Sequence, residues 1–167
     1  MNLLDILSAG KRDLNEENVS SFLAWLLDPG QSHGCGSLFL KHLLQIINDK
    51  KFEPWITGPI NVVAYRQLSS IKVDVLVEET VETAIGKRRD VDIVIFLSYG
   101  NNVHVFAIEN KIREEASDVT QLAEECEGLA SAYTGAEISF LYLTPNKSNK
   151  FIEAFKLLPE NITKAAL

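Results

Sequence analysis

The sequence of 167 residues is poor in cysteine, and its two cysteines, Cys35 and Cys126, do not form a spaced set of metal ligands. We interpret both as small core residues, and so few cysteines are typical of the reducing cytoplasm. Long hydrophobic runs are also missing. No apolar stretch approaches the roughly 18 residues of a membrane span, and the first residues reach charge too soon for a signal peptide. We therefore expect a cytoplasmic protein without a membrane segment.

A surplus of positive charge is missing as well, since 16 Lys and Arg stand against 23 Asp and Glu, for a formal net charge of −7. This balance argues against a protein that coats nucleic acid along its whole surface. The charges are unevenly distributed, however. Residues 114–127 contain six acids and no base, whereas residues 86–113 contain five bases and three acids. A local basic track is therefore compatible with the composition.

What the chain does have is apolar content, 46% of its residues, which suits one globular domain with a substantial core. Helical spacing runs from the N-cap Asn15 to Pro29, from Ser37 to Ile47 and from Asp118 to Tyr133, and strand patterns cover residues 61–65, 71–77, 91–97, 103–108 and 137–143. This order predicts an α/β sandwich. Its last strand follows a helical crossover, so we expect that strand to pair in parallel.

A hairpin is the most informative part of the sequence, because the apolar runs VDIVIFL and VHVFAI flank the turn sequence SYGNN. If Gly100 and Asn101 form a two-residue turn, Asp92 lies directly opposite Glu109, with the two Cβ atoms roughly 5 Å apart. Side chains alternate along a strand, so Lys111 shares the face of Glu109. The hairpin therefore brings two acids and an amine together.

Asp90, two residues before Asp92, is expected on the same face as a further acid. Buried charges are costly unless they are paired or bound to a metal. One interpretation is a cross-strand salt bridge of Lys111 with Asp92 or Glu109. The other is a site for a hard cation such as Mg²⁺, which one or two carboxylates commonly hold. The cation site depends on the register, because a slip by one residue moves Asp92 to the other face.

These residues resemble a known family. Asp92, followed after sixteen residues by Glu109-Asn110-Lys111, is similar to the D…E-x-K motif of the PD-(D/E)XK nuclease superfamily. The earlier runs ENVSSFLAWLLDP and SHG, and the later run DVTQL, resemble an uncharacterised bacterial branch of that superfamily. The resemblance covers residues 15–145 or so. It departs from the motif at Val91, which stands where the family name has proline.

The resemblance implies a restriction-endonuclease-like, three-layer core of order αβββαβ, with a mixed sheet of four to five strands between helices. It implies a metal-dependent nuclease that hydrolyses phosphodiester bonds in DNA, ahead of RNA, in restriction, repair or phage defence. Asp92, Glu109 and the main-chain carbonyl of Asn110 would hold Mg²⁺, with Mn²⁺ as a substitute. Lys111 would orient or deprotonate the attacking water.

Glu17 and Gln121 each have two interpretations. The resemblance makes Glu17 an outer acid that faces the metal through water, whereas its place in a first helical turn predicts an interaction with the helix dipole. The resemblance places Gln121 over the active face, whereas a capping box formed by Asp118 and Gln121 accounts for it structurally. The sequence leaves both alternatives open.

Four basic residues flank the predicted site and are candidates for contacting DNA phosphates: Lys87, Arg88, Arg89 and Arg113. The alternative for the first three is an exposed turn. Two other functions stay open for the whole chain. One is a catalytically inactive nucleic-acid-binding or protein-interaction module on the same fold. The other is an unrelated α/β interaction domain in which Lys111 is merely salt-bridged.

We place the nuclease-like core at residues 1–145 and expect residues 146–167 to form a helix and a tail that this core does not require. Because relatives in the branch look longer, we expect the tail to begin a region that is truncated here. The oligomeric state stays open, with a homodimer as one alternative.

Overall fold

The fold was analysed in a computed structural model, which describes residues 15–49, 71–111, 119–143 and 163–166. The elements are α2 (Glu16–Leu27), α3 (Leu38–Asp49), β1 (Lys72–Glu82), β2 (Arg88–Tyr99), β3 (Asn102–Asn110), α5 (Val119–Ala132), β4 (Glu137–Leu143) and β5 (Thr163–Ala166). The five strands form one sheet in the order β1-β2-β3-β4-β5. The first two pairings are antiparallel and the last two are parallel. The predicted mixed α/β sheet is confirmed.

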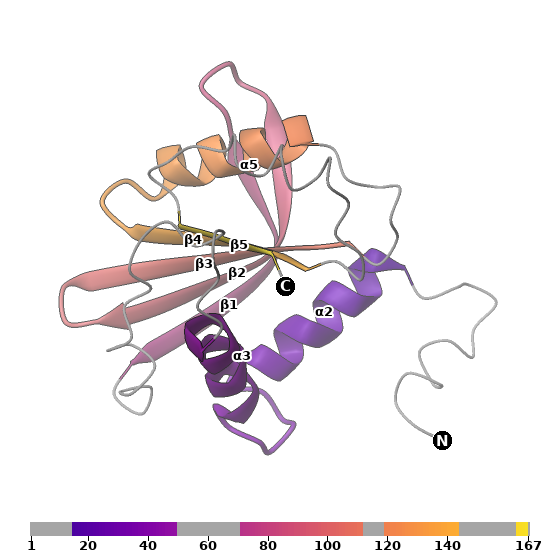
Figure 1. Cartoon of the computed structure of the whole chain (residues 1–167), viewed down its shortest axis with the longest axis vertical. Coiled ribbons are helices and arrows are strands. Elements are labelled where there is room, and N and C mark those ends of the chain that lie inside the picture. The colour runs from indigo at the N-terminus through magenta and orange to yellow at the C-terminus, as the bar shows by residue number, and fades with distance from the viewer. Residues whose placement is uncertain (1–14, 50–70, 112–118, 144–162, 167) are drawn as a thin grey trace.

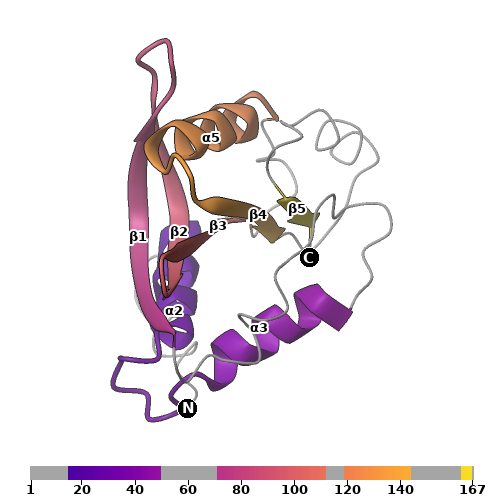
Figure 2. The same cartoon turned by 90° about the vertical axis from the view of Figure 1, so that its left-hand side faces the viewer.

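Helices cover both faces of this sheet (Figures 1 and 2). On one face, α5 packs through Leu122, Cys126 and Leu129 onto a buried layer from the central strands. On the other face, α2 and α3 pack onto a second layer that includes Ile93 and Ile108. The two layers alternate along β2 and β3, as expected for strands buried on both sides. The result is the three-layer arrangement that the sequence predicted.

The predicted hairpin turn and register are confirmed. Gly100 has φ +57°, a left-handed conformation that glycine adopts without a steric penalty. Tyr99 lies opposite Asn102, and the pairing continues in step to Ile93 opposite Ile108. One further step in the same register brings Asp92 opposite Glu109. Both acids therefore stand where the sequence placed them, at the open end of the hairpin.

β1 continues past the predicted end at Val77 and reaches Glu82. Glu78 interrupts it with φ +54°, which is uncommon for a residue with a side chain. The pairing of β1 with β2 skips Glu78 and Asp92, the two residues opposite each other at this point. Beyond the interruption the alternation of β2 changes, because Val91 and Val94 pack into the same layer.

This change corrects the expectation that Asp90 shares the face of Asp92. Asp90 is exposed, and its Oδ1 atom accepts a hydrogen bond of 2.6 Å from the Thr80 hydroxyl. Strict alternation from Asp92 to Asp90 fails because the distortion at Glu78, on β1, lies opposite Asp92. Asp90 is therefore not part of the acidic cluster.

Part of the expected C-terminal tail is a strand, whereas the helix expected before it falls among residues 144–162, outside the described residues. Residues Thr163–Ala166 form β5, which pairs in parallel with β4 and completes the sheet. The division of the chain at residue 145 stays a prediction, and the strand expected at residues 61–65 lies outside the described residues. Among the helices that the structure describes, none is long and apolar enough to span a bilayer.

Candidate functional site

The candidate site lies where the pairing of β2 with β3 ends and where the first turns of α2 and α5 approach these strands. The Asn15 side chain caps α2, accepting a hydrogen bond of 2.9 Å from the Asn18 amide. One turn later, the Ser20 hydroxyl accepts a hydrogen bond of 3.3 Å from the Asn110 side chain. The amide of Lys111 donates to the Leu143 carbonyl at 2.8 Å. These bonds hold the end of β3 between a helix and a neighbouring strand.

Asp92 is half-buried on β2. Its Oδ2 atom accepts a hydrogen bond of 2.7 Å from the backbone amide of Asn110. Burial raises the pKa of Asp92, whereas the Asn110 amide and the nearby charge of Lys111 oppose the rise. The hydrogen bond links the two strands at the point where their regular pairing ends and fixes the orientation of the carboxylate.

Glu109 is the most buried acid of the hairpin, with an exposed fraction of 1%. Its Oε1 atom lies 2.7 Å from Lys111 Nζ, and its Oε2 atom is buried without a hydrogen-bond partner among the described residues. Burial, followed by the charge of Asp92, raises the pKa of Glu109 to about 7. A buried carboxylate oxygen without a partner is unfavourable by itself and suits a cation.

Lys111 lies between two acids, with Nζ 2.7 Å from Glu109 and 3.5 Å from Glu16. Burial disfavours the charged amine, but the hydrogen bond and charge of Glu109, helped by Glu16, still raise the pKa of Lys111. Lys111 is therefore protonated at neutral pH. The salt bridge foreseen for Lys111 is present, but it leaves the negative charge of the cluster in excess.

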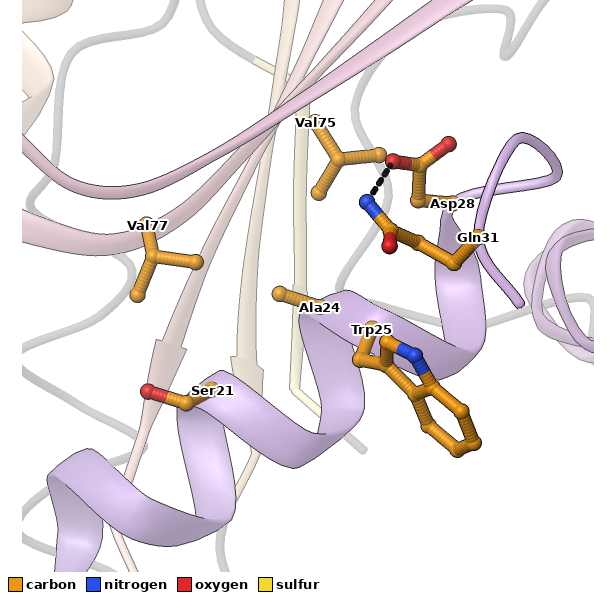
Figure 3. A pocket seen from close by; sticks show the side chains of 7 residues that line it. All are labelled: Ser21, Ala24, Trp25, Asp28, Gln31, Val75 and Val77. Carbon is orange, nitrogen blue, oxygen red and sulfur yellow. Dashed lines mark hydrogen bonds between the residues drawn. The ribbon is translucent and has the colours of Figure 1, made fainter. Parts of the chain in front are cut away.

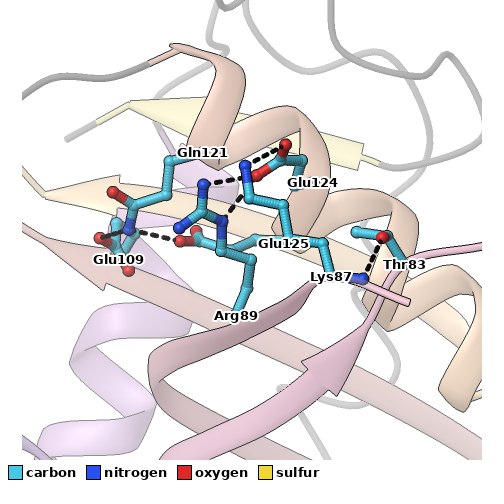
Figure 4. A network of polar contacts seen from close by, with 7 residues as sticks. All are labelled: Thr83, Lys87, Arg89, Glu109, Gln121, Glu124 and Glu125. Atoms are coloured by element: carbon cyan, nitrogen blue, oxygen red, sulfur yellow. Dashed lines mark hydrogen bonds and ion pairs between the residues drawn. The ribbon is translucent and has the colours of Figure 1, made fainter. Parts of the chain in front are cut away.

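Gln121 lies over this face, as the resemblance implied. Its side-chain amide is 3.3 Å from Glu109 Oε1 and 2.6 Å from Glu125 Oε1, so it lies between two carboxylates (Figure 4). The expected capping partner, Asp118, lies outside the described residues.

The sequence analysis missed Glu125, which it counted only as one of the six acids of residues 114–127. Glu125 is fully buried, and its Oε2 atom has no hydrogen-bond partner within the described residues. Burial, followed by the charge of Glu109, raises the pKa of Glu125 to about 8. The available signal was its spacing of four residues from Gln121, which places both on one side of a helix.

The structure places Glu16, and not Glu17, beside Lys111. Glu17 is exposed, and its Oε2 atom accepts a hydrogen bond of 3.2 Å from the Asn15 side chain. Adjacent residues differ by about 100° around a helix, so only one of them can face the sheet. The expected placement of Glu17 as the outer acid is therefore corrected in favour of Glu16.

A sequence model of the PD-(D/E)XK nuclease superfamily matches residues 1–164, nearly the whole chain. The chain belongs to the PD-(D/E)XK nuclease superfamily. Its members are in general hydrolytic nucleases that typically use divalent metal ions. Neither a curated protein nor a solved structure matches the chain.

The acids of this member of the superfamily meet the chemical requirement for a hard cation. Asp92 and Glu109 supply carboxylate oxygens from opposed strands, and Glu109 Oε2 has no hydrogen-bond partner among the residues that the structure describes. Within the described residues, no group of three or more His, Cys, Asp or Glu side chains is spaced to hold a metal ion. The two carboxylates alone suit a hard divalent ion, which one or two carboxylates can hold while water completes its coordination.

The predicted basic residues are arranged less favourably for contacts with DNA. Lys87 Nζ lies 2.8 Å from Glu124 Oε1, and the Arg89 guanidinium lies 2.6 Å from Glu124 Oε2 (Figure 4). The hydrogen bond from Lys87 and the charge of Arg89 lower the pKa of Glu124. Arg88 is exposed and has no ion pair within the described part of the chain, which does not include Arg113. Lys87 and Arg89 thus already face an acid.

A separate pocket of about 170 Å³ lies between α2 and β1, lined by Ser21, Ala24, Trp25, Asp28, Gln31, Val75 and Val77. Val75 and Val77 point toward α2, while the Trp25 ring is turned away from β1 (Figure 3). A hydrogen bond of 2.8 Å joins the Gln31 side chain to Asp28. This pocket adjoins the later turns of α2, whereas the acidic cluster adjoins the first turns.

His33, in the loop after this helix, is outside the acidic cluster. Its Nε2 atom lies 3.0 Å from the Asp28 carbonyl, and its Nδ1 atom accepts a hydrogen bond of 3.0 Å from the Cys35 amide. Because Nδ1 accepts, Nε2 carries the proton and donates. His33 therefore orders its loop, as expected for a histidine beside glycines.

Proposed function

We propose that this PD-(D/E)XK protein is a Mg²⁺-dependent nuclease that hydrolyses phosphodiester bonds in DNA, with Mn²⁺ as a substitute ion. One observation carries the proposal: Asp92 and Glu109 meet at the open end of the hairpin beside Lys111, and a buried oxygen of Glu109 has no hydrogen-bond partner in the described part of the chain. A salt bridge alone would need one acid. The excess of carboxylate supports a site that is completed by a cation.

Asp92 and Glu109, with the main-chain carbonyl of Asn110, are the residues that would hold the ion. When bound there, a divalent ion supplies a Lewis acid for the phosphate and lowers the pKa of water so that it can attack. The hydrogen bond from the Asn110 amide keeps Asp92 oriented toward this position. The Gln121 side chain restrains Glu109 from the side of α5.

Lys111 is proposed to position the attacking water or a phosphate oxygen. Its contact with Glu109 keeps the amine protonated, so it is suited to donate hydrogen bonds and poorly suited to accept a proton. Glu16 extends the same network from α2. Of the two roles that the sequence left open for Lys111, orientation is therefore better supported than deprotonation.

DNA is proposed to run past the start of β2, where Lys87, Arg88 and Arg89 follow one another. Arg113 stays a candidate from the sequence. Since Glu124 already pairs with Lys87 and Arg89, their contact with phosphate requires those ion pairs to be exchanged or shared. Arg88, which is exposed, is the most available of the three.

The test is cleavage of plasmid, duplex, single-stranded DNA and RNA by the purified chain with Mg²⁺ or Mn²⁺, with and without a chelator. We expect metal-dependent cleavage of DNA that the matched Asp92→Asn variant lacks. Mn²⁺ binding by the parent and by Asp92→Asn, measured by calorimetry, provides a readout that does not depend on choosing the right substrate.

A second candidate is a catalytically inactive binding module on the same fold. The observation that favours it is the engagement of Lys87 and Arg89 by Glu124 in a chain of net charge −7, since both weaken attraction to a polyanion. A parent protein that binds no Mn²⁺ and cuts no nucleic acid would favour this module over the nuclease.

A further inference from the structure

Glu125 is the most buried acid of α5, and the D…E-x-K motif does not include it. Its exposed fraction is 0%, and its helix neighbours Leu122, Cys126 and Leu129 belong to the apolar layer beneath α5. A carboxylate in such a place is unfavourable unless it is hydrogen-bonded, paired with a base or bound to a metal. Its adjacent residue, Glu124, shows the ordinary alternative, because two basic side chains pair with that carboxylate.

The only hydrogen bond that the Glu125 side chain makes within the described residues comes from the Gln121 side chain, at 2.6 Å. The same nitrogen of Gln121 lies 3.3 Å from Glu109. Figure 4 shows the amide of Gln121 lying between the two carboxylates. The bond to Glu125 is the shorter one, so Glu125 fixes where the amide stands, and the amide limits where Glu109 can turn.

Direct ligation by Glu125 fits the geometry less well. Asp92, Glu109 and Glu125 do not form a group of three spaced to hold one metal ion in the part of the chain that the structure describes. A role through a neighbour is consistent with metal sites in general, where residues behind the ligands orient them.

We propose that Glu125 is a positioning residue of the cation site, which fixes the Glu109 carboxylate through the side-chain amide of Gln121. This inference rests on the proposed cation site and extends it by one residue. It predicts that Glu125 matters as a hydrogen-bond acceptor and not for its charge. It also predicts that Glu125 matters only while Gln121 is present.

The test is a double-mutant cycle on Mn²⁺ affinity, measured by calorimetry with the full chain and without nucleic acid. Glu125→Ala should weaken Mn²⁺ binding about 10-fold, at the lower end of what loss of an orienting residue does. In a Gln121→Ala background, the same change should have an effect of less than about twofold, because the relay is already broken. Glu127→Ala, on the exposed side of the same helix, is the matched control and should leave Mn²⁺ affinity unchanged.

The conservative variant Glu125→Gln separates positioning from charge. It keeps an oxygen that can accept from Gln121, so we expect its Mn²⁺ affinity to stay within about threefold of the parent. If Glu125 were a ligand, Glu125→Gln would lose as much affinity as Glu125→Ala, and the proposal would be overturned. Equal effects of Glu125→Ala with and without Gln121 would overturn it too.

Two controls keep the result unambiguous. Thermal unfolding of each variant checks that it is folded, and Glu125→Leu, which fills the space with apolar atoms, replaces Glu125→Ala if alanine does not fold. Unchanged Mn²⁺ affinity in a folded Glu125→Leu variant would overturn the inference alone. A parent protein that binds no Mn²⁺ overturns the proposed function and this inference together.

Discussion

The two ends of β3 each bury a polar side chain, but the two side chains have different charged neighbours. His104, near the turn, has an exposed fraction of 1%, as does Glu109 near the open end. Each has one buried atom without a hydrogen-bond partner in the described structure, Nδ1 of His104 and Oε2 of Glu109. His104 answers burial by losing its charge, because desolvation lowers its pKa to about 4. Burial also raises the pKa of Glu109, to about 7, but Glu109 lies beside a second acid, Asp92, and the amine of Lys111.

The neighbours of the two residues explain the difference. The His104 Nε2 atom lies 2.9 Å from the Ser139 hydroxyl, and its ring stacks on Phe106 at 4.2 Å, so a neutral imidazole fits. Glu137 lies 3.4 Å from Nδ1 but makes no hydrogen bond to it, and burial prevails over its charge. Around Glu109, several carboxylates share the single amine of Lys111. A buried polar group made neutral is structural, whereas a buried excess of acids supports the proposed cation site.

Substitutions of the two acids should have the largest effect, and they test whether the open end of β3 differs in function from the His104 end. Asp92→Asn and Glu109→Gln should each abolish metal-dependent cleavage, by about 1,000-fold or more, since each removes ligand charge but hardly any volume. Cleavage rate and Mn²⁺ affinity are the measurements. His104→Gln, an equally buried change at the other end of β3, should leave the cleavage rate within about twofold. Equal losses in both places would mean that the effect comes from the fold.

The next prediction removes Lys111, the basic side chain beside Glu109. Lys111→Ala should lower the cleavage rate about 100- to 10,000-fold, in the range for a positioned proton donor, while Mn²⁺ still binds. Removing the amine frees Glu109 Oε1, so Mn²⁺ affinity should hold or rise. Lys72→Ala, which breaks an exposed ion pair of 2.6 Å with Asp74, is the matched control. Loss of Mn²⁺ binding in Lys111→Ala would contradict a role in positioning alone.

His104 should reveal itself through stability and pH. The unfolded chain protonates this side chain near pH 6.5, but the folded protein does so only at about 4. Stability should therefore fall as the pH drops through this window, by about 3 kcal/mol in all. Urea unfolding of the parent and of His104→Gln between pH 7 and 4 measures this, because glutamine keeps a partner for Ser139 and does not titrate. Parallel curves for the two proteins would show that His104 contributes nothing.

Much of the site could be predicted from the sequence because one local signal determines it. A two-residue turn at Gly100 and Asn101 sets the register, and the register alone places Asp92 opposite Glu109. The apolar runs on either side of the turn are rich in β-branched and aromatic residues and predict strands by themselves. The choice between the two roles of Gln121 could not be made from the sequence, because it depends on how α5 is placed over the sheet.

The errors have the same origin, since each concerns a contact that local patterns do not encode. Glu125 was missed because the acids of residues 114–127 were counted together. Its spacing of four residues from Gln121 already placed the two on one face of a helix. Glu16 and Glu17 differ only in helix phase, which a cap does not fix to within one residue. Asp90 was misplaced because the positive φ of Glu78, on another strand, interrupts the alternation. The pairing of Arg89 with Glu124 joins residues 35 positions apart.

That last pairing leads to the smallest effect, which concerns DNA affinity. Each phosphate that a basic residue contacts adds about −0.9 to the slope of log affinity against log salt. Arg88→Ala should therefore flatten the slope by about one, because Arg88 is free of ion pairs in the described residues. Arg89→Ala should flatten it less while Glu124 holds the guanidinium. Glu124→Gln should raise DNA affinity and steepen the slope by up to about two, since Lys87 and Arg89 are released together.

Binding of a duplex to a cleavage-dead Asp92→Asn protein, titrated over a range of salt concentrations, measures these slopes without loss of substrate. Glu127→Gln removes the same charge from the same helix. Glu127 accepts a hydrogen bond from the Ala84 amide and pairs with no basic side chain among the described residues, so the slope of this variant should match that of the parent. If Glu124→Gln and Glu127→Gln change affinity equally, the gain comes from net charge and not from the released pair. If neither Arg88→Ala nor Glu124→Gln changes the slope, the start of β2 is only an exposed turn. The phosphates must then be bound elsewhere, with Arg113 as the remaining candidate from the sequence.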